Sequence, residues 1–199
     1  RIVHDQAAAT ITYQDAQFEL FGVPVLYVPY FQHADPSVKR RSGFLAPQYG
    51  NSESLGTMVE IPYYYVLAPN ADFLFNPNFL SKKGVLYQGE FRHRLESGQY
   101  SVRFAGIDDE TEGLRGTLET KGKFSLGSWW HFGWDATLES DDQFRRYYKL
   151  DNMLLTDRVN KVFFTGISDR NYFNATMYHF GGLLVDDQPH SESLVHPVV

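Results

Sequence analysis

Clusters of carboxylates are the residues of this chain that could most readily do chemistry. They lie at residues 108–112, 141–142 and 186–187. Neighbouring carboxylates can act as a general acid and base, and several carboxylate oxygens together can hold Ca²⁺. Runs of Asp and Glu are nevertheless more often solvated loop residues, and this is the interpretation that we favour. We therefore predict no catalytic residue and no metal site in these clusters.

Other sequence signatures of enzymes are also missing. The histidines, at positions 4, 33, 93, 131, 179, 190 and 196, include no i, i+4 pair. The chain contains no G-x-S-x-G, no glycine-rich phosphate loop and no H-E-x-x-H. Because it has no cysteine, thiolate nucleophiles and disulfides are excluded as well. We expect neither a cofactor nor an enzymatic activity.

A short basic run at Lys39, Arg40 and Arg41 offers a different kind of chemistry. The guanidinium group of arginine presents a fork of donors that matches a phosphate group. The same run could equally be an interfacial anchor or a solubilising linker, and both interpretations stay open. The formal net charge of -6 and the sequence pI near 5.6 give no global basic field. Nucleic-acid binding is therefore excluded as a main role.

The elements that would position these groups are strands, because apolar and polar residues alternate with a period of two. Around position 90, Tyr87, Phe91 and Leu95 fall on one face, and charged residues fall on the other. The same alternation continues through the following segments. The polar face is predicted to carry Glu90, Arg92, Arg94, Arg103, Arg115, Glu119 and Lys121. We predict nine strands, centred near residues 46, 61, 74, 90, 103, 118, 132, 161 and 177.

Short and long connections alternate between these predicted strands. The short ones are predicted at residues 68–70, 96–99, 121–123 and 168–171, and the longer polar ones at 81–84, 108–113, 140–152 and 186–193. This alternation indicates an antiparallel up-and-down meander. A soluble β-sandwich fits the pattern, and so does part of a transmembrane β-barrel. The length of the strands, the unequal loops and the aromatic residues near strand ends favour the barrel.

Two prolines interrupt the first predicted hairpin. Pro47 and Pro62 flank a turn at residues 51–56, whose centre near position 53 or 54 puts both prolines at nearly equal height on neighbouring strands. Proline has no N–H to donate and is usually confined to strand ends and sheet edges. From the residues alone, these prolines are interpreted as the ends of strands near a membrane boundary.

An ordered series of segments resembles the LptD (OstA/Imp) family of outer-membrane lipopolysaccharide assembly proteins. The segments are GVPVLYVPYF at 22–31, KRRSGFLAP at 39–47, EIPYYYVLAPNADF at 60–73, KKGVLYQGEFRHRL at 82–95, SDDQFRRYY at 140–148 and DRNYF at 169–173. The resemblance implies that residues 1–33 end a periplasmic β-jellyroll and that residues 34–199 begin a large outer-membrane β-barrel. The missing cysteines are a departure from the family, so a disulfide-controlled maturation is not carried over.

The resemblance also implies roles for the residues singled out above. Lipopolysaccharide would cross the barrel lumen, lined by the charged face, and would enter the outer leaflet through a lateral gate weakened by Pro47 and Pro62. Lys39, Arg40 and Arg41 would contact its head group. The implied partners are lipopolysaccharide, a plug lipoprotein LptE, the periplasmic bridge protein LptA and outer-membrane lipids. The alternatives are an outer-membrane barrel enzyme and a soluble β-sandwich binding module.

Overall fold

The first of two compact units is a small antiparallel sheet. The computed structural model describes residues 2–5, 10–20, 23–34, 40–151, 157–182 and 193–198, and it divides the chain into units at residues 1–43 and 44–199. In the first unit, β1 (Ile2–Asp5), β2 (Thr10–Leu20) and β3 (Val23–Ala34) pair in that order. Its assignment to the end of a jellyroll, at residues 1–33, stays a prediction.

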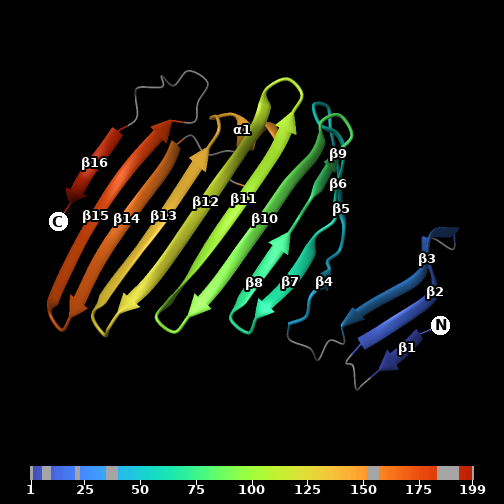
Figure 1. The fold of residues 1–199 in the computed structure, drawn as a ribbon, viewed down its shortest axis with the longest axis horizontal. Coiled ribbons are helices and arrows are strands. Elements are labelled where there is room, and N and C mark those ends of the chain that lie inside the picture. The colour runs from blue at the N-terminus through green and yellow to red at the C-terminus, as the bar shows by residue number, and fades with distance from the viewer. Residues whose placement is uncertain are drawn as a thin grey trace. The chain divides into compact units, whose positions relative to one another are not determined.

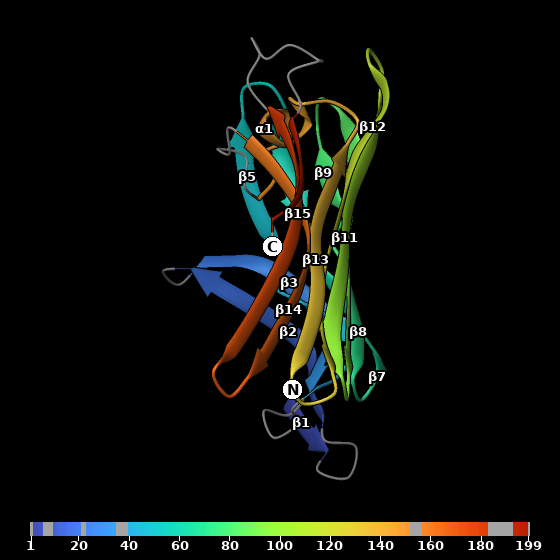
Figure 2. The ribbon, with the colours of Figure 1, turned by 90° about the vertical axis from the view of Figure 1, so that its left-hand side faces the viewer.

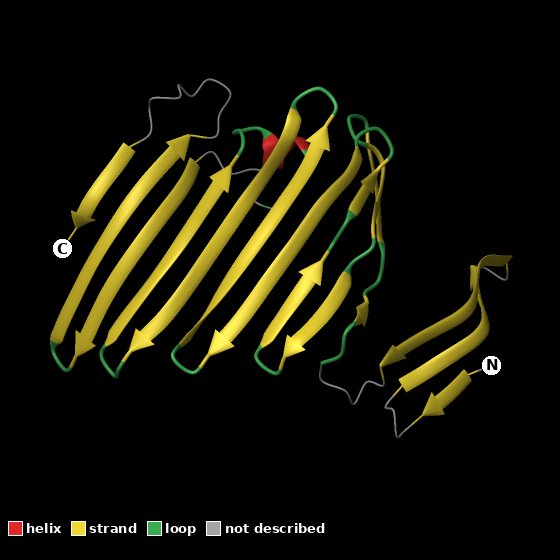
Figure 3. Ribbon diagram, viewed as in Figure 1, coloured by secondary structure: helices red, strands yellow, loops and turns green. Residues whose placement is uncertain are grey.

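In its described residues, the second unit is an antiparallel meander with one short helix (Figures 1 and 3). Its elements are β4 (Gly43–Phe44), β5 (Gln48–Ser52), β6 (Gly56–Glu60), β7 (Tyr63–Ala68), β8 (Ala71–Phe75), β9 (Asn78–Leu80), β10 (Gly84–Leu95), β11 (Gly98–Asp109), β12 (Gly113–Leu126), β13 (Trp130–Glu139), α1 (Phe144–Tyr147), β14 (Asp157–Ser168), β15 (Asn171–Gly182) and β16 (Ser193–Val198). From β10 to β16 each strand pairs with the next along the chain. The all-β class and the up-and-down order are confirmed, and the described part of the sheet is open.

The six predicted strands from position 90 onward are confirmed as single long strands of 10 to 14 residues. The three before them are each broken in two, and every break falls at a proline. One predicted turn is wrong, because residues 121–123 lie inside β12. Gly122 is not a turn residue there: the ring of Trp134 packs where its side chain would be, and the turn comes later, at Gly127 with a φ of 71°.

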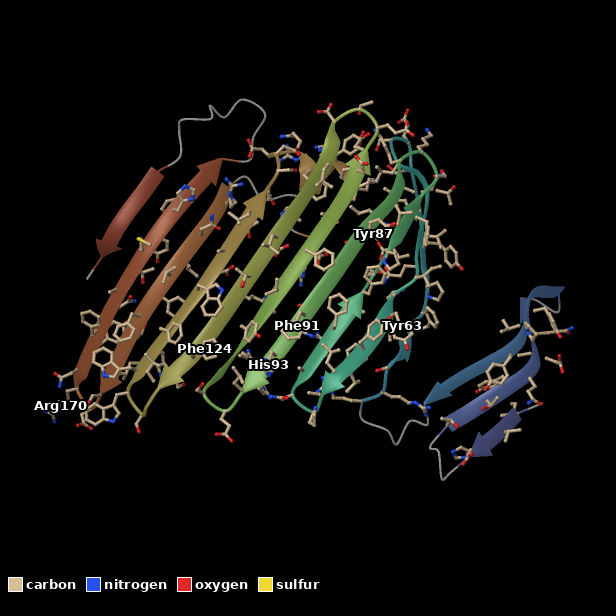
Figure 4. All side chains as sticks on the ribbon, in the orientation of Figure 1. Tyr63, Tyr87, Phe91, His93, Phe124 and Arg170 are labelled. Atoms are coloured by element: carbon tan, nitrogen blue, oxygen red, sulfur yellow. The ribbon has the colours of Figure 1, made fainter. Side chains whose placement is uncertain are left out.

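One face of the sheet carries a band of packed aromatic rings (Figure 4). Phe73 and Phe104 stack with centroids 6.4 Å apart, and Phe124 and Phe132 stack at 5.3 Å. Leucines on this face are strongly exposed, with Leu114 at 83%. A soluble sandwich would cover such a face with a second sheet, whereas none covers it among the described residues. We call it the outer face.

The opposite, inner face holds the small hydrophobic core. Figure 2 shows the sheet edge-on, with α1 and β5 together on this side. The core consists of Leu55, Leu80, Leu86, Ala105, Ile107, Phe144 and Tyr148. On β12 the rest of the inner face is polar, whereas on β14 and β15 it also carries Phe163, Ile167 and Tyr178. In the described part of the chain, no helix has both the length and the apolar character that a membrane-spanning helix needs.

Neighbouring positions on β10 provide a test of these two faces. Phe91 lies on the outer face beside Tyr100, and Arg92 lies on the inner face, 2.7 Å from Asp72. If the outer face meets lipid, as the resemblance implies, we expect Phe91→Arg to cost up to about 2–4 kcal/mol. Arg92→Ala removes a partly exposed ion pair worth about 0–1 kcal/mol. The fraction of heat-modifiable, folded protein in membranes should therefore fall mainly for Phe91→Arg; equal or reversed effects would refute the assignment of faces.

Candidate functional site

Three prolines form a row across the first strands of the second unit. Pro47 separates β4 from β5, Pro62 separates β6 from β7, and Pro77 separates β8 from β9. The prolines come to similar levels because Gln48 lies opposite Glu60, which in turn lies opposite Asn78. The near-equal height of Pro47 and Pro62 was predicted, whereas Pro77 was missed. The signal that could have found it is the repeated interval of 15 residues between the three.

Few backbone hydrogen bonds hold the sheet together along this proline row. Leu45 N–H donates to the carbonyl of Pro62 at 2.9 Å, and Ile61 N–H donates to the carbonyl of Pro77 at 3.2 Å. Facing residues in a closely spaced antiparallel pair normally exchange two such bonds. A proline cannot return the second one. At each of these two positions, neighbouring strands are therefore joined by one backbone hydrogen bond instead of two.

The strands take separate partners above and below the proline row. Below it, β4, β7 and β8 form a lower piece, in which β8 pairs with Gly89–His93 of β10. Above it, β5, β6 and β9 form an upper piece, in which β9 pairs with residues 84–86 of the same strand. In Figure 2, β5 lies away from the plane of the long strands. The sheet therefore bends at the proline row.

A cluster of three polar side chains, Glu60, Asn76 and Asn78, lies at this bend on the inner face, and we call it the polar knot. Glu60 accepts hydrogen bonds from the side-chain amides of Asn76 at 3.0 Å and of Asn78 at 3.1 Å. In the described residues, the amide oxygens of both asparagines are buried without a hydrogen-bond partner. Burying an unpaired oxygen costs about 1–3 kcal/mol. The knot is therefore poorly optimised for stability.

The predicted charged face is brought together on the inner side of the sheet. Arg103 lies in register with Glu90 on one neighbouring strand and Glu119 on the other, and its guanidinium is 3.6 Å from the Glu90 carboxylate. The remaining members share this face by strand parity: Arg92, Arg94, Arg115 and Lys121. Their role as a lumen lining stays a prediction.

The segment at residues 140–151, which we call the inner segment, differs from its predicted form. We expected a long polar loop, but it folds onto the inner face of the sheet. Phe144 is fully buried and Tyr148 is 2% exposed, and both join the core beside Leu55, Leu86 and Ile107. The missed signal is the group of aromatic residues inside an otherwise polar stretch. Apolar rings in a connection gain free energy when they find a core to enter.

Arginine pairs fix the inner segment to the long strands. Arg145 is 7% exposed and bonds Glu139, Glu119 at 2.8 Å and the Thr117 hydroxyl at 3.0 Å. Arg115 donates two hydrogen bonds to Asp141, at 2.9 and 2.7 Å. Such forked pairs fix orientation as well as distance. Burial alone would raise the pKa of Asp141, but the bonds from Arg115 and Ser140 hold this pKa below its ordinary value.

Asp109 is a buried anchor, so its predicted solvated character is wrong. It is 2% exposed and accepts from the Tyr148 hydroxyl at 2.5 Å, from Lys83 Nζ at 3.1 Å and from Thr111. Burial is the largest cause that raises the pKa of Tyr148, and the hydrogen bond to the Asp109 carboxylate is the second. The pair at 186–187 lies outside the described residues. Among those described, no group of three or more acidic, histidine or cysteine side chains could hold a metal ion.

A cavity of about 510 Å³ lies between the upper piece, the long strands and the inner segment. Charged groups of both signs line it, including Glu60, Glu90, Arg103, Glu119 and Asp151. Apolar side chains, including Met58, Leu74 and Leu150, line it as well, so the cavity offers charged groups beside apolar surface. Of the predicted basic run, Arg40 and Arg41 are exposed and Lys39 lies outside the described residues. Their contact with a phosphorylated head group stays a prediction.

Comparison of the sequence with known proteins identifies the family of this chain. The sequence profile of the LptD family, described as LPS transport system D, matches residues 113–198. The LPS-assembly protein LptD of Idiomarina loihiensis is 34% identical over 169 residues, which cover 84% of this chain and 19% of that protein. The LPS-assembly protein LptD of Pseudomonas fluorescens is 32% identical over 87% of this chain and 16% of its own length. This chain belongs to the LptD family and corresponds to a segment of its longer members.

Proposed function

We propose that the chain is the part of an outer-membrane β-barrel at which lipopolysaccharide leaves the barrel and enters the outer leaflet. The outer face, with its packed rings and exposed leucines, meets lipid. The inner face and its cavity meet the saccharide. The edge formed by the first strands opens to let the acyl chains pass sideways, and no covalent chemistry takes part.

The observation that carries this proposal is the proline row, which breaks the first three long strands of the sheet at similar levels. Hydrocarbon offers no water to replace a missing backbone hydrogen bond, so a membrane-embedded sheet is under pressure to complete its ladder. Here the ladder is incomplete on three adjacent strands, beside a polar knot with unpaired buried oxygens. A weak edge is favourable where the sheet has to open.

Membership of the LptD family supports a proposal for the partners and the location. We propose lipopolysaccharide as the cargo, the lipoprotein LptE as the plug, LptA as the periplasmic bridge and outer-membrane lipids as the surroundings. The first unit would lie in the periplasm, and the second in the outer membrane. Arg40 and Arg41, with Lys39, would meet phosphate groups of the cargo. Pro47 and Pro62 would form the gate, together with Pro77.

Neither alternative function is supported as well. A binding sandwich leaves the exposed outer face unexplained. An enzyme at the outer rim would need carboxylates free to react, whereas Asp109 and Asp141 are held by structural hydrogen bonds. The acidic residues of these connections are better explained as anchors for the inner segment.

Replacing both Pro47 and Pro62 with alanine tests the gate. The change restores up to two ladder bonds, each worth about 0.5–1.5 kcal/mol, so the barrel should assemble at least as well. Export should fall, because each added bond must break when lipid passes, and the double variant should be affected more than either single one. Surface lipopolysaccharide and outer-membrane permeability measure the effect in cells with normal barrel levels.

The matched control is Pro69→Ala, in the turn between β7 and β8 and away from the proline row. It changes the same residue type but adds no bond at the proposed gate, so export should be unchanged. If the double variant exports as well as this control, the gate proposal is discarded. Pro47 and Pro62 would then only mark the ends of strands.

Pro77→Ala extends the test to the third strand. Its new N–H can return the bond that Ile61 already donates to the carbonyl of residue 77. We expect export to fall in the same direction, but less than for Pro62→Ala because β9 lies further from the edge. Hydrogen exchange at residue 77 should show protection in the variant. An unprotected amide there, or increased export, would contradict a role for the complete row.

A further inference from the structure

The tip of the first hairpin, residues 53–56, is held from two sides. On one side is the connection at 81–83: Lys82 N–H donates to the Leu55 carbonyl at 3.2 Å, and Lys82 Nζ donates to the Glu53 carbonyl at 2.7 Å. On the other side is the buried core, where the Leu55 side chain has no exposed surface. A turn residue at a hairpin tip is normally solvated, so this leucine is unusually well fixed.

The core around Leu55 is completed by the inner segment. Phe144 and Tyr148 supply its two rings, with centroids 5.1 Å apart. Tyr148 is also joined to the connection at 81–83, because Asp109 accepts from both its hydroxyl and Lys83. The upper piece is thus held by a segment that lies far beyond it in the sequence.

The inner segment can act as a support because its other contacts are made with the long strands. Arg145 binds Glu119 of β12 and Glu139 of β13, and Arg115 of β12 binds Asp141. β12 pairs with β11 from Gly113 to Phe124 and with β13 from Thr117 to Leu126. The segment therefore connects the continuous part of the sheet to the part above the proline row.

From these contacts we propose that the inner segment is a clasp, which holds the upper piece in place while the proline row serves as its hinge. Phe144 and Tyr148 are positioning residues for the gate. The proposal rests on the proposed function for what the hinge is used for. The clasp itself depends only on the packing. Because one backbone hydrogen bond instead of two joins neighbouring strands at these positions of the row, the ladder fixes the upper piece weakly there, and the buried core determines its orientation.

Hydrogen exchange of the full-length protein in membranes tests the clasp. Tyr148→Phe keeps the ring and removes the hydroxyl that bonds Asp109, and Phe144→Ala removes a buried ring. We expect amides at residues 48–60 to exchange about tenfold faster in Tyr148→Phe, and faster still in Phe144→Ala. Amides at 63–75, below the row, and at 98–103, outside the buried core, should be unchanged.

The matched control is Arg146→Ala, an exposed position on the same helix. It should leave exchange unchanged everywhere. Unchanged exchange at 48–60 in both ring variants would overturn the clasp, and so would an equal increase at 63–75, which indicates general destabilisation. The gate is tested separately, by measuring outer-membrane permeability in cells that carry the same variants. Faster hydrogen exchange without any change in permeability would refute the proposed function at this edge but would leave the clasp supported.

Discussion

The interaction on which the structure depends is the backbone ladder between neighbouring strands. From β10 to β13, and between β14 and β15, pairing is nearly continuous, and it places every second side chain of β10 to β13 on the aromatic outer face. A single-layer sheet has little core of its own, so its stability comes from this ladder and from contacts between side chains on each face. Any residue that cannot donate to the ladder therefore has a direct structural effect.

Such residues are concentrated at one edge of the sheet. The breaks at Pro47, Pro62 and Pro77 divide three strands at similar levels and free the upper piece to leave the plane. The structure then compensates with side chains. Leu55 enters a core that Phe144 and Tyr148 complete, and Arg145 fixes the segment that supplies them. At this edge, the backbone ladder therefore contributes less to stability, and a small buried cluster beside it contributes more.

The sequence was most informative where one local pattern decides the structure. Alternation of residue types predicted the faces of β10 to β13, since neighbouring side chains on a strand must point to opposite sides. It could not predict the inner segment, because the burial of Phe144 and Tyr148 depends on contacts with distant residues such as Leu55 and Asp109. Gly122 was misjudged for a related reason: a glycine beneath a tryptophan ring has the same local signal as a glycine in a turn.

The central claim is that cargo leaves at the edge formed by the first strands. Its most direct test is photocrosslinking in living cells, with a photoreactive residue in place of exposed Tyr49 on β5 and, for comparison, in place of exposed Leu138 on β13. If cargo leaves at this edge, lipopolysaccharide should crosslink at position 49 while export proceeds, this signal should be lost when export is blocked, and position 138 should give no export-dependent signal. Equal crosslinking at both positions, or none at position 49 during active export, would contradict the central claim.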